Sequence, residues 1–159
     1  MTDITNTDDL IDVRDIIARV EELEAEREAL QGEIDSAEAQ WLETKAGTDE
    51  ARTAVELRLS AAYLALQSEA AELSTLSALL ADLAGYGGDE QWRGDWYPVT
   101  LIRDSYFKDY AQELAEDVCS YDISNVAWPL TCIDWEKAAR ELQMDYSTVE
   151  FDGVTYWYR

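Results

Sequence analysis

The chain has 159 residues, the size of one ordinary domain or of a long helical segment joined to one small domain. Its 35 acidic and 12 basic residues leave a formal charge of −23, which excludes binding to nucleic acid through a broad basic surface and predicts that any electrostatic partner is basic. Because the chain has no histidine, catalytic sites built on a histidine base and zinc sites that contain histidine are excluded as well.

Several features predict a folded, soluble protein of the cytoplasm. No run approaches the roughly 18 apolar residues of a membrane-spanning helix, and the N-terminus MTDITNTDDLID is acidic where a secretion signal is basic. Cys119 and Cys132 are too few for a four-cysteine metal site and too far apart for a C-x-x-C redox motif, so we expect buried thiols in a reducing compartment. Six Trp and nine Tyr within a hydrophobic content of 47% are too much apolar surface for a disordered chain.

Residues 1–84 predict an antiparallel helical hairpin, or coiled coil. Apolar or small residues recur at alternating steps of three and four, which is the pattern of a heptad seam. Gly47 can end the first helix and Thr48 can cap the second. Arg27 interrupts the first seam and Glu69 the second. The first seam comprises Val13, Ile16, Val20, Leu23, Leu30, Ile34, Ala37 and Trp41, and the second Leu59, Ala62, Leu66, Leu73, Leu76, Leu80 and Leu83.

Apolar residues also lie outside the two seams. Two helices bury only one stripe each, so the additional apolar positions predict further packing, for which self-association into a four-helix arrangement is the simplest source. We therefore expect a homodimer. These positions are Ile17, Leu42, Val55, Leu57, Tyr63, Leu64 and Leu79.

The rest of the chain predicts a Gly-rich linker at residues 85–95 and a small α+β domain at residues 96–159. We expect a strand at 96–102, a helix at 104–118, and a helix that Asp134 caps at its N-terminus. Asp152 and Gly153 separate two β-rich runs, which is a strong hairpin signal. The order β-α-α-β-β predicts a three-stranded antiparallel sheet, with Trp128, Trp135 and Trp157 in the core.

No motif points to catalysis. Carboxylates are so numerous that no particular pair stands out, and the sequence has neither a calcium-binding loop nor a Gly-rich phosphate loop. We therefore predict a non-enzymatic protein with no catalytic residues, no cofactor and no metal site.

The acidic surface is the candidate for function. Residues 1–84 hold 20 acidic and 6 basic residues, a net charge of −14, and residues 85–159 hold 15 and 6, a net charge of −9. Carboxylates three or four residues apart on a helix lie about 5–6 Å from one another at Cβ, so rows of them can imitate a phosphate backbone. A charged face more often only keeps a helix soluble. Here the charge far exceeds the magnitude of ~2–8 that suffices for a small domain.

Residues 99–118 (VTLIRDSYFKDYAQELAEDV) and 128–159 (WPLTCIDWEKAARELQMDYSTVEFDGVTYWYR) resemble the C-terminal part of the ArdA antirestriction proteins, which phages, plasmids and conjugative transposons carry. The shared features are a helix ending in Glu116 and Asp117, a proline-containing loop, a helix opened by Ile133-Asp134-Trp135, Asp145 near its end, and a closing hairpin. ArdA proteins are acidic, elongated, dimeric DNA mimics that occupy the DNA-binding groove of type I restriction-modification enzymes. Their N-terminal part is normally a small β-containing domain leading into a helical domain, whereas a heptad hairpin fills this region here.

The resemblance implies an anti-defence inhibitor that presents carboxylates to a basic DNA-binding channel inside the bacterial host. The target stays open, because a CRISPR effector or another nucleic-acid-binding defence protein would offer a similar channel. A coiled-coil adaptor that docks a partner through apolar residues is a further alternative, and it would respond little to salt. The predicted partner-binding residues are Glu21, Glu22, Glu24, Glu28, Asp35 and Glu38 in the hairpin, and Glu113, Glu116, Asp117, Asp122, Asp145 and Asp152 in the C-terminal domain.

Overall fold

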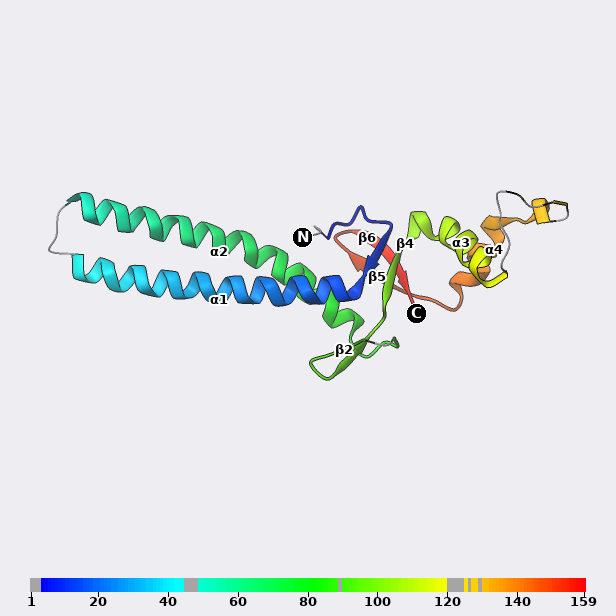
Figure 1. The fold of residues 1–159 in the computed structure, drawn as a ribbon, viewed down its shortest axis with the longest axis horizontal. Helices are drawn as coiled ribbons and strands as arrows, with labels where there is room; N and C mark the ends of the chain where they lie inside the picture. The colour runs from blue at the N-terminus through cyan, green and yellow to red at the C-terminus, as the bar shows by residue number, and fades with distance from the viewer. Residues whose placement is uncertain (1–3, 45–48, 89, 120–124, 126, 129) are drawn as a thin grey trace. The chain divides into compact units, whose positions relative to one another are not determined.

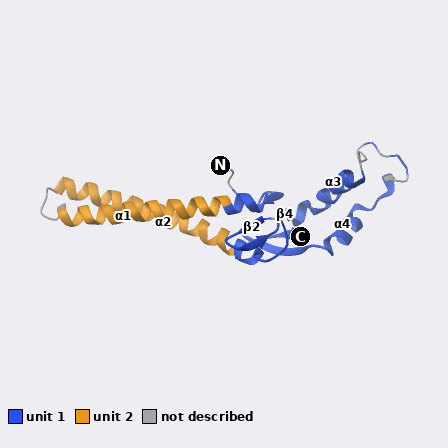
Figure 2. Cartoon of the chain, turned by 60° about the horizontal axis from the view of Figure 1, so that its bottom comes forward, with its two compact units in different colours: residues 1–17, 79–159 blue, residues 18–78 orange. Residues whose placement is uncertain are grey.

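The computed structural model describes residues 4–44, 49–88, 90–119, 125, 127–128 and 130–159 (Figure 1). Over these residues the fold is mixed α+β, as the sequence predicts at that level. It divides into two compact units (Figure 2). Residues 18–78 form one, called here the helical unit, and residues 1–17 with 79–159 form the other, called the α/β unit. The N-terminal segment thus belongs with the C-terminal part, which differs from the predicted boundary at residue 84.

Two long helices occupy the segments where the heptad seams predict them. They are α1 (Val13–Thr44) and α2 (Asp49–Leu83). Within the helical unit Arg19 pairs with Glu72, and Glu33, further along α1, pairs with the earlier Arg58 of α2, so the helices run antiparallel. The predicted helix ends at Gly47 and Thr48 lie outside the described residues. Seam side chains are buried or half-buried throughout, with Leu23 and Leu83 at 0% exposure.

The charged interruptions of the two seams fall in the same layer of the helical unit. Arg27 shares a hollow with Leu66, Ala70 and Leu73 of α2, which brackets the position of Glu69. The Arg27 side chain is exposed, whereas Glu69 is half-buried, and its Oε2 atom is buried without a hydrogen-bond partner. This layer is a polar defect in an otherwise apolar seam.

The main sheet has four strands, so the prediction of three is wrong. The strands are β1 (Leu10–Asp12), β4 (Thr100–Arg103), β5 (Ser147–Phe151) and β6 (Val154–Tyr158), in the order β1-β4-β6-β5 with every neighbour antiparallel. The additional strand, β1, pairs Leu10 with Ile102 and Ile11 with Leu101. A three-residue strand is too short to show the alternation by which strands are recognised in a sequence.

Residues 85–95 are not a structureless linker, because a second hairpin begins there. It consists of β2 (Glu90–Trp92) and β3 (Asp95–Tyr97), joined by Arg93 and Gly94 with φ angles of 51° and 91°. The predicted strand 96–102 is therefore two strands, β3 and β4. Pro98 falls in the break between them, and having no N–H it cannot donate to a sheet ladder.

Both predicted helices of the C-terminal part are present. A 3-10 turn, η1 (Asp104–Tyr106), leads into α3 (Phe107–Cys119), and another, η3 (Leu130–Cys132), precedes α4 (Trp135–Gln143). The Asp134 carboxylate accepts a hydrogen bond from the backbone N–H of Lys137 at 3.0 Å, which confirms the predicted cap. The core here comprises Ile102, Phe107, Ala111 and Ala139, with Tyr106, Tyr110, Leu142, Tyr146 and Trp157 packed around it.

The closing hairpin is also as predicted. β5 and β6 pair from Ser147 opposite Tyr158 to Phe151 opposite Val154. Asp152 and Gly153 have φ angles of 48° and 78°, the left-handed conformation that a two-residue turn between antiparallel strands requires.

Three side chains expected to be buried are exposed. Trp157 and Trp135 are half-buried, but Trp128 is 81% exposed. Cys119 and Cys132 are exposed thiols, so the expectation of buried cysteines is wrong. Cys119 lies 12 residues after the buried Phe107 and 8 residues after the buried Ala111. At 3.6 residues per turn, these steps place Cys119 roughly 80–120° around the helix axis from the buried face of α3.

Candidate functional site

The predicted acidic residues of the helical unit all lie on α1. Glu21, Glu28 and Asp35 are exposed and seven residues apart, so they share one face of the helix at intervals of ~10.5 Å. Glu38 is also exposed, whereas Glu22 and Glu24 are half-buried. The helix therefore presents a continuous acidic row that its own seam does not bury.

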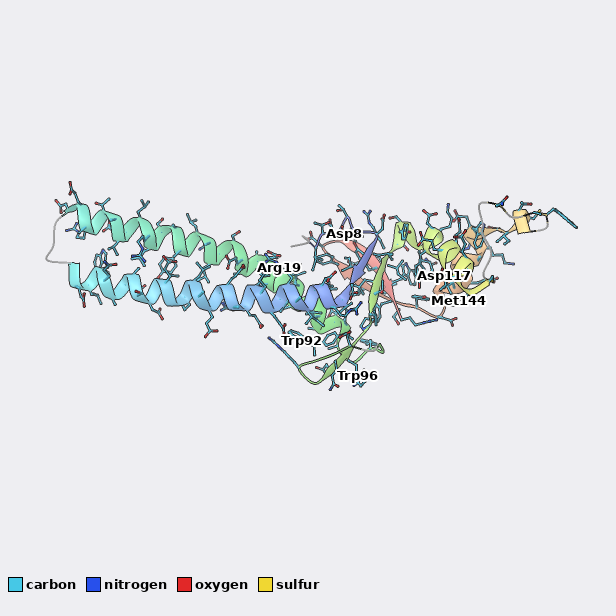
Figure 3. All side chains as sticks on the ribbon, viewed as in Figure 1. Asp8, Arg19, Trp92, Trp96, Asp117 and Met144 are labelled. Carbon is cyan, nitrogen blue, oxygen red and sulfur yellow. The ribbon has the colours of Figure 1, made fainter. Side chains whose placement is uncertain are left out.

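The basic residues of the helical unit are largely paired within it. Arg19 (labelled in Figure 3) lies 2.8 Å from a carboxylate oxygen of Glu22 and 2.8 Å from one of Glu72. These hydrogen bonds raise the pKa of Arg19, and the bond from Arg19 lowers the pKa of Glu72. Arg58 is 3.4 Å from Glu33. These pairs offset Glu22 and Glu33 of α1, yet residues 18–44 still hold nine acidic residues against two basic ones, a net charge of −7.

Two of the predicted carboxylates are held by neutral donors. The Asp35 carboxylate accepts a hydrogen bond from the Gln31 amide at 2.9 Å, one helical turn away. The Tyr63 hydroxyl of α2 donates to Glu38 at 2.7 Å, and this bond raises the pKa of Tyr63. Neutral donors orient these carboxylates without cancelling their charge.

An open hollow of about 530 Å³ lies along α1 among the predicted acids. Gly32, whose missing side chain leaves open space, forms part of it. The hollow places the Arg27 guanidinium among carboxylates, so the charge is locally reduced there. Within the described part of the chain, no group of three or more His, Cys, Asp or Glu side chains could hold a metal ion. The lining residues are Glu24, Arg27, Glu28, Gln31, Gly32 and Asp35.

The other predicted acids belong to the α/β unit and come from separate elements. Glu113, Glu116 and Asp117 lie on α3 (Asp117 is labelled in Figure 3), Asp145 follows α4, and Asp152 lies in the β5–β6 turn. All are exposed except Glu116, which is half-buried. Asp122 lies outside the described residues. The predicted set is thus divided between the two units.

The α/β unit also contains an acidic cluster that the sequence did not reveal. The Tyr106 hydroxyl donates to Glu113 at 2.5 Å, and this bond, with smaller contributions from Asp109 and Asp9, raises the pKa of Tyr106 to about 12. Arg103 lies 3.8 Å from Asp9. Glu113 thus binds the phenol directly, and Asp109 and Asp9 act on it through their charge.

The N-terminal acids Asp8 and Asp9 are held against the α/β unit because β1, which follows them, joins the sheet. The Tyr156 hydroxyl donates to the Asp8 backbone carbonyl at 2.8 Å, and the Asp8 carboxylate accepts from the Thr5 N–H at 2.8 Å. The sequence shows that this segment is acidic, but it does not show where the segment lies in the fold. The segment's position follows only from the pairing of β1 with β4.

Exposed aromatic and apolar side chains form a second kind of surface on the α/β unit. Trp96 is 50% exposed, and the Arg93 guanidinium lies over the Trp92 ring at 4.1 Å (both tryptophans are labelled in Figure 3). Met144 is 79% exposed. These side chains come from separate elements of the unit, and none of the three residues Trp92, Trp96 and Met144 can act as an acid or a base.

Comparison with protein-family models, with curated proteins and with solved structures found no match to this chain. No helix of the described residues is both long and apolar enough to span a membrane.

Proposed function

We propose that this chain is a non-enzymatic anti-defence protein of a phage or mobile element. It acts in the cytoplasm of the bacterial host as an acidic DNA mimic that blocks the DNA-binding site of a type I restriction-modification enzyme. In this proposal the helical unit is a coiled-coil hairpin and residues 96–159 supply an ArdA-like part. The protein works stoichiometrically, without cofactor or metal, and its partner is a basic channel rather than nucleic acid.

The observation that carries the proposal is the charge density along α1. Eight carboxylates occur from Glu21 to Glu38, a length of ~26 Å, which is about one per 3 Å. Three of them, Glu22, Glu26 and Glu33, lie within 4 Å of Arg19 or Arg58. One strand of DNA carries a charge every 3.4 Å or so along the helix axis. Arg27 is the only basic residue within that stretch.

The charge balance of the helical unit supports the same function. Residues 18–78 hold 14 acidic and 5 basic residues, a net charge of −9. The pairing of Arg19 and Arg58 inside the unit leaves them little capacity to neutralise the outer carboxylates. A basic channel that binds DNA supplies the missing cations, and both partners then release counterions.

A CRISPR effector is an alternative target because it binds nucleic acid in a similarly basic channel. A non-enzymatic adaptor is a second alternative, and the exposure of Leu57 and Leu64 on α2, at 72% and 65%, is the observation in its favour. If the chain mimics DNA, its affinity for either target falls steeply as the salt concentration rises. The affinity of an adaptor that docks through apolar residues changes little with salt.

The direct test is a competition titration. The chain is added to a type I restriction enzyme bound to labelled duplex DNA, at a low and a high salt concentration. We expect displacement near one inhibitor per DNA-binding site, and weaker displacement at high salt. No displacement at low salt refutes this target, after which the same titration with a CRISPR effector tests the alternative.

Two matched variants locate the inhibitory surface, since each removes four negative charges. One carries Glu21→Gln, Glu24→Gln, Glu28→Gln and Asp35→Asn in the helical unit. The other carries Glu113→Gln, Glu116→Gln, Asp117→Asn and Asp145→Asn in the α/β unit. If α1 carries the contact, the first variant loses inhibition by roughly tenfold or more while the second stays near wild type, and single substitutions have small effects. Equal losses would mean that net charge alone matters.

A further inference from the structure

Strand β5 is an outer strand of the main sheet. The order β1-β4-β6-β5 gives it one neighbour among the described strands, β6 (both are labelled in Figure 1). Its register with β6 runs without a break from Ser147 to Phe151, so β5 has no bulge. It also has neither proline nor lysine, two residue types with which proteins commonly protect an exposed edge. The other outer strand, β1, is only three residues long and leads directly into α1.

The hairpin geometry shows which backbone groups of β5 point away from β6. Phe151 and Val154 flank a two-residue turn, so they form a hydrogen-bonded pair, and bonded and non-bonded pairs alternate along an antiparallel ladder. The N–H and C=O groups of Thr148 and Glu150 therefore point outward. No backbone hydrogen bond from another described element reaches these four groups. This edge can accept a further strand.

The surroundings of the edge are acidic. Residues 141–152, which contain β5, hold four acidic residues and no basic one. Lys137 lies 3.7 Å from the first of these acids, and no ion pair between described residues includes the other three. Arg159 lies over the Tyr146 ring at 5.5 Å, four residues or ~13 Å along the chain from Glu150. The four acids are all exposed, at Glu141, Asp145, Glu150 and Asp152.

We propose that β5 is the docking edge for an extended basic segment of a partner protein, which joins the sheet as a fifth strand antiparallel to β5. The partner's backbone bonds to the outward groups of Thr148 and Glu150, as in other cases of strand addition to a sheet edge. Antiparallel addition continues the pattern of this sheet and is slightly more stable than parallel addition. Partner side chains opposite Thr148 and Glu150 project to the same face as these two, so a lysine or arginine opposite Glu150 forms a cross-strand ion pair.

A basic segment fits this edge better than a second copy of the chain does. The β5 strand of a second copy would bring the same four acids to the edge and no base, so the two edges would repel each other. A neutral segment would gain the backbone hydrogen bonds alone. The backbone bonds thus provide affinity for any extended segment, and the charge selects a basic one.

This docking edge is independent of the proposed mimicry of DNA. Mimicry depends on the carboxylates of α1 in the helical unit, whereas strand addition depends on the backbone of β5 in the α/β unit. Either proposal can therefore fail while the other holds, and the binding assay for this edge contains no restriction enzyme and no DNA.

The probe is a fluorescently labelled peptide of seven residues that alternates lysine and valine, so that all its lysines share one face when it is extended. It is titrated into the full-length chain and followed by fluorescence anisotropy. Because a cationic peptide can bind an acidic chain at many places, matched variants locate the contact. Thr148→Pro removes an outward N–H without removing a bond to β6, whereas Thr148→Val keeps that N–H. We expect Thr148→Pro to weaken binding by about tenfold or more, and Thr148→Val to bind within about twofold of the wild type.

A second pair of variants tests the contribution of charge at the edge. Glu150→Lys should weaken binding of the peptide by about tenfold or more, because it places a like charge opposite the peptide's lysines. Glu43→Lys is the matched control: it changes the net charge equally, but Glu43 is an exposed residue of α1 in the helical unit. Its variant should bind within about threefold of the wild type.

Amide hydrogen exchange measured by NMR locates the added strand on the wild-type chain, without any substitution that could disturb folding. The peptide should slow exchange by about tenfold or more at the Thr148 and Glu150 amides, which point outward. The amides of Val149 and Phe151 already bond to β6 and should change little.

Four results would overturn the proposal. They are no binding of the peptide, binding that leaves exchange at Thr148 and Glu150 unchanged, equal binding by Thr148→Pro and Thr148→Val, and equal losses in Glu150→Lys and Glu43→Lys. A fifth concerns the chain without peptide: if the Thr148 and Glu150 amides are protected at high protein concentration and lose this protection on dilution, a second copy fills the edge instead.

Discussion

Replacing Glu69 by leucine should stabilise the helical unit. Glu69 occupies a heptad position of the α2 seam, where its neighbours Leu66 and Leu73 are apolar. Its Oε2 atom is buried without a hydrogen-bond partner, so the folded chain bears the cost of removing part of a carboxylate from water. Leucine at this position would continue the seam and remove that cost.

The expected gain is about 2 kcal/mol in the free energy of unfolding. An unsatisfied buried polar atom costs ~1–3 kcal/mol, and we use the lower half of that range because Glu69 as a whole is only half-buried. Partial burial of a leucine adds roughly 1 kcal/mol, and the helix propensities of Glu and Leu are nearly equal. For a chain of 159 residues, 2 kcal/mol corresponds to an increase in Tm of ~4–8 °C.

The assay is thermal unfolding followed by circular dichroism at the helix signal. Glu72→Leu is the matched control, since it removes the same charge from the same helix but breaks the pair with Arg19 at 2.8 Å. Because that pair is partly exposed, its loss should leave stability unchanged or lower it by up to ~1 kcal/mol. The reasoning is refuted if Glu69→Leu is no more stable than the wild type, or if Glu72→Leu gains as much.

The α/β unit provides three further predictions. Asp134→Ala should cost about 1 kcal/mol in denaturant unfolding, because it removes the side-chain cap on the Lys137 N–H; an unchanged midpoint would contradict this. Gly88→Ala should cost at least roughly 2 kcal/mol in the same assay, since at φ +82° its Cβ would lie 1.8 Å from the Tyr97 backbone oxygen, and a near-neutral result would refute this reasoning. Burial and the Tyr110 hydroxyl raise the pKa of Tyr146 to about 12, so the neutral phenol favours the folded state. Stability should therefore fall as the pH rises from about 10 to about 12, and Tyr146→Phe should lessen the fall in alkaline unfolding.

The elements that the sequence predicted correctly are those with repeated or chemically specific signals. Both long helices follow from heptads sustained over many turns, in which a few interruptions such as Arg27 do not obscure the period. The Asp152–Gly153 turn and the Asp134 cap depend on residue types with strong local preferences.

The missed elements are short or depend on contacts distant in the sequence. β1 is three residues long and is a strand only because it pairs with β4. β2 and β3 are joined by Arg93 and Gly94, and arginine at a left-handed turn position is not a recognised hairpin signal. The exposure of Cys119 depends on which side of α3 packs against the core, and the residue type, usually buried, indicated the opposite.

The acidic residues show the same limit for the candidate site. Helical spacing was enough to predict that Glu21, Glu28 and Asp35 share a face, because all three lie on one uninterrupted helix. It could not predict that Asp9 and Glu113 would both raise the pKa of Tyr106, since 104 residues separate those two acids in the chain. Periodicity thus locates charges within an element, and pairing between elements decides which charges share a surface.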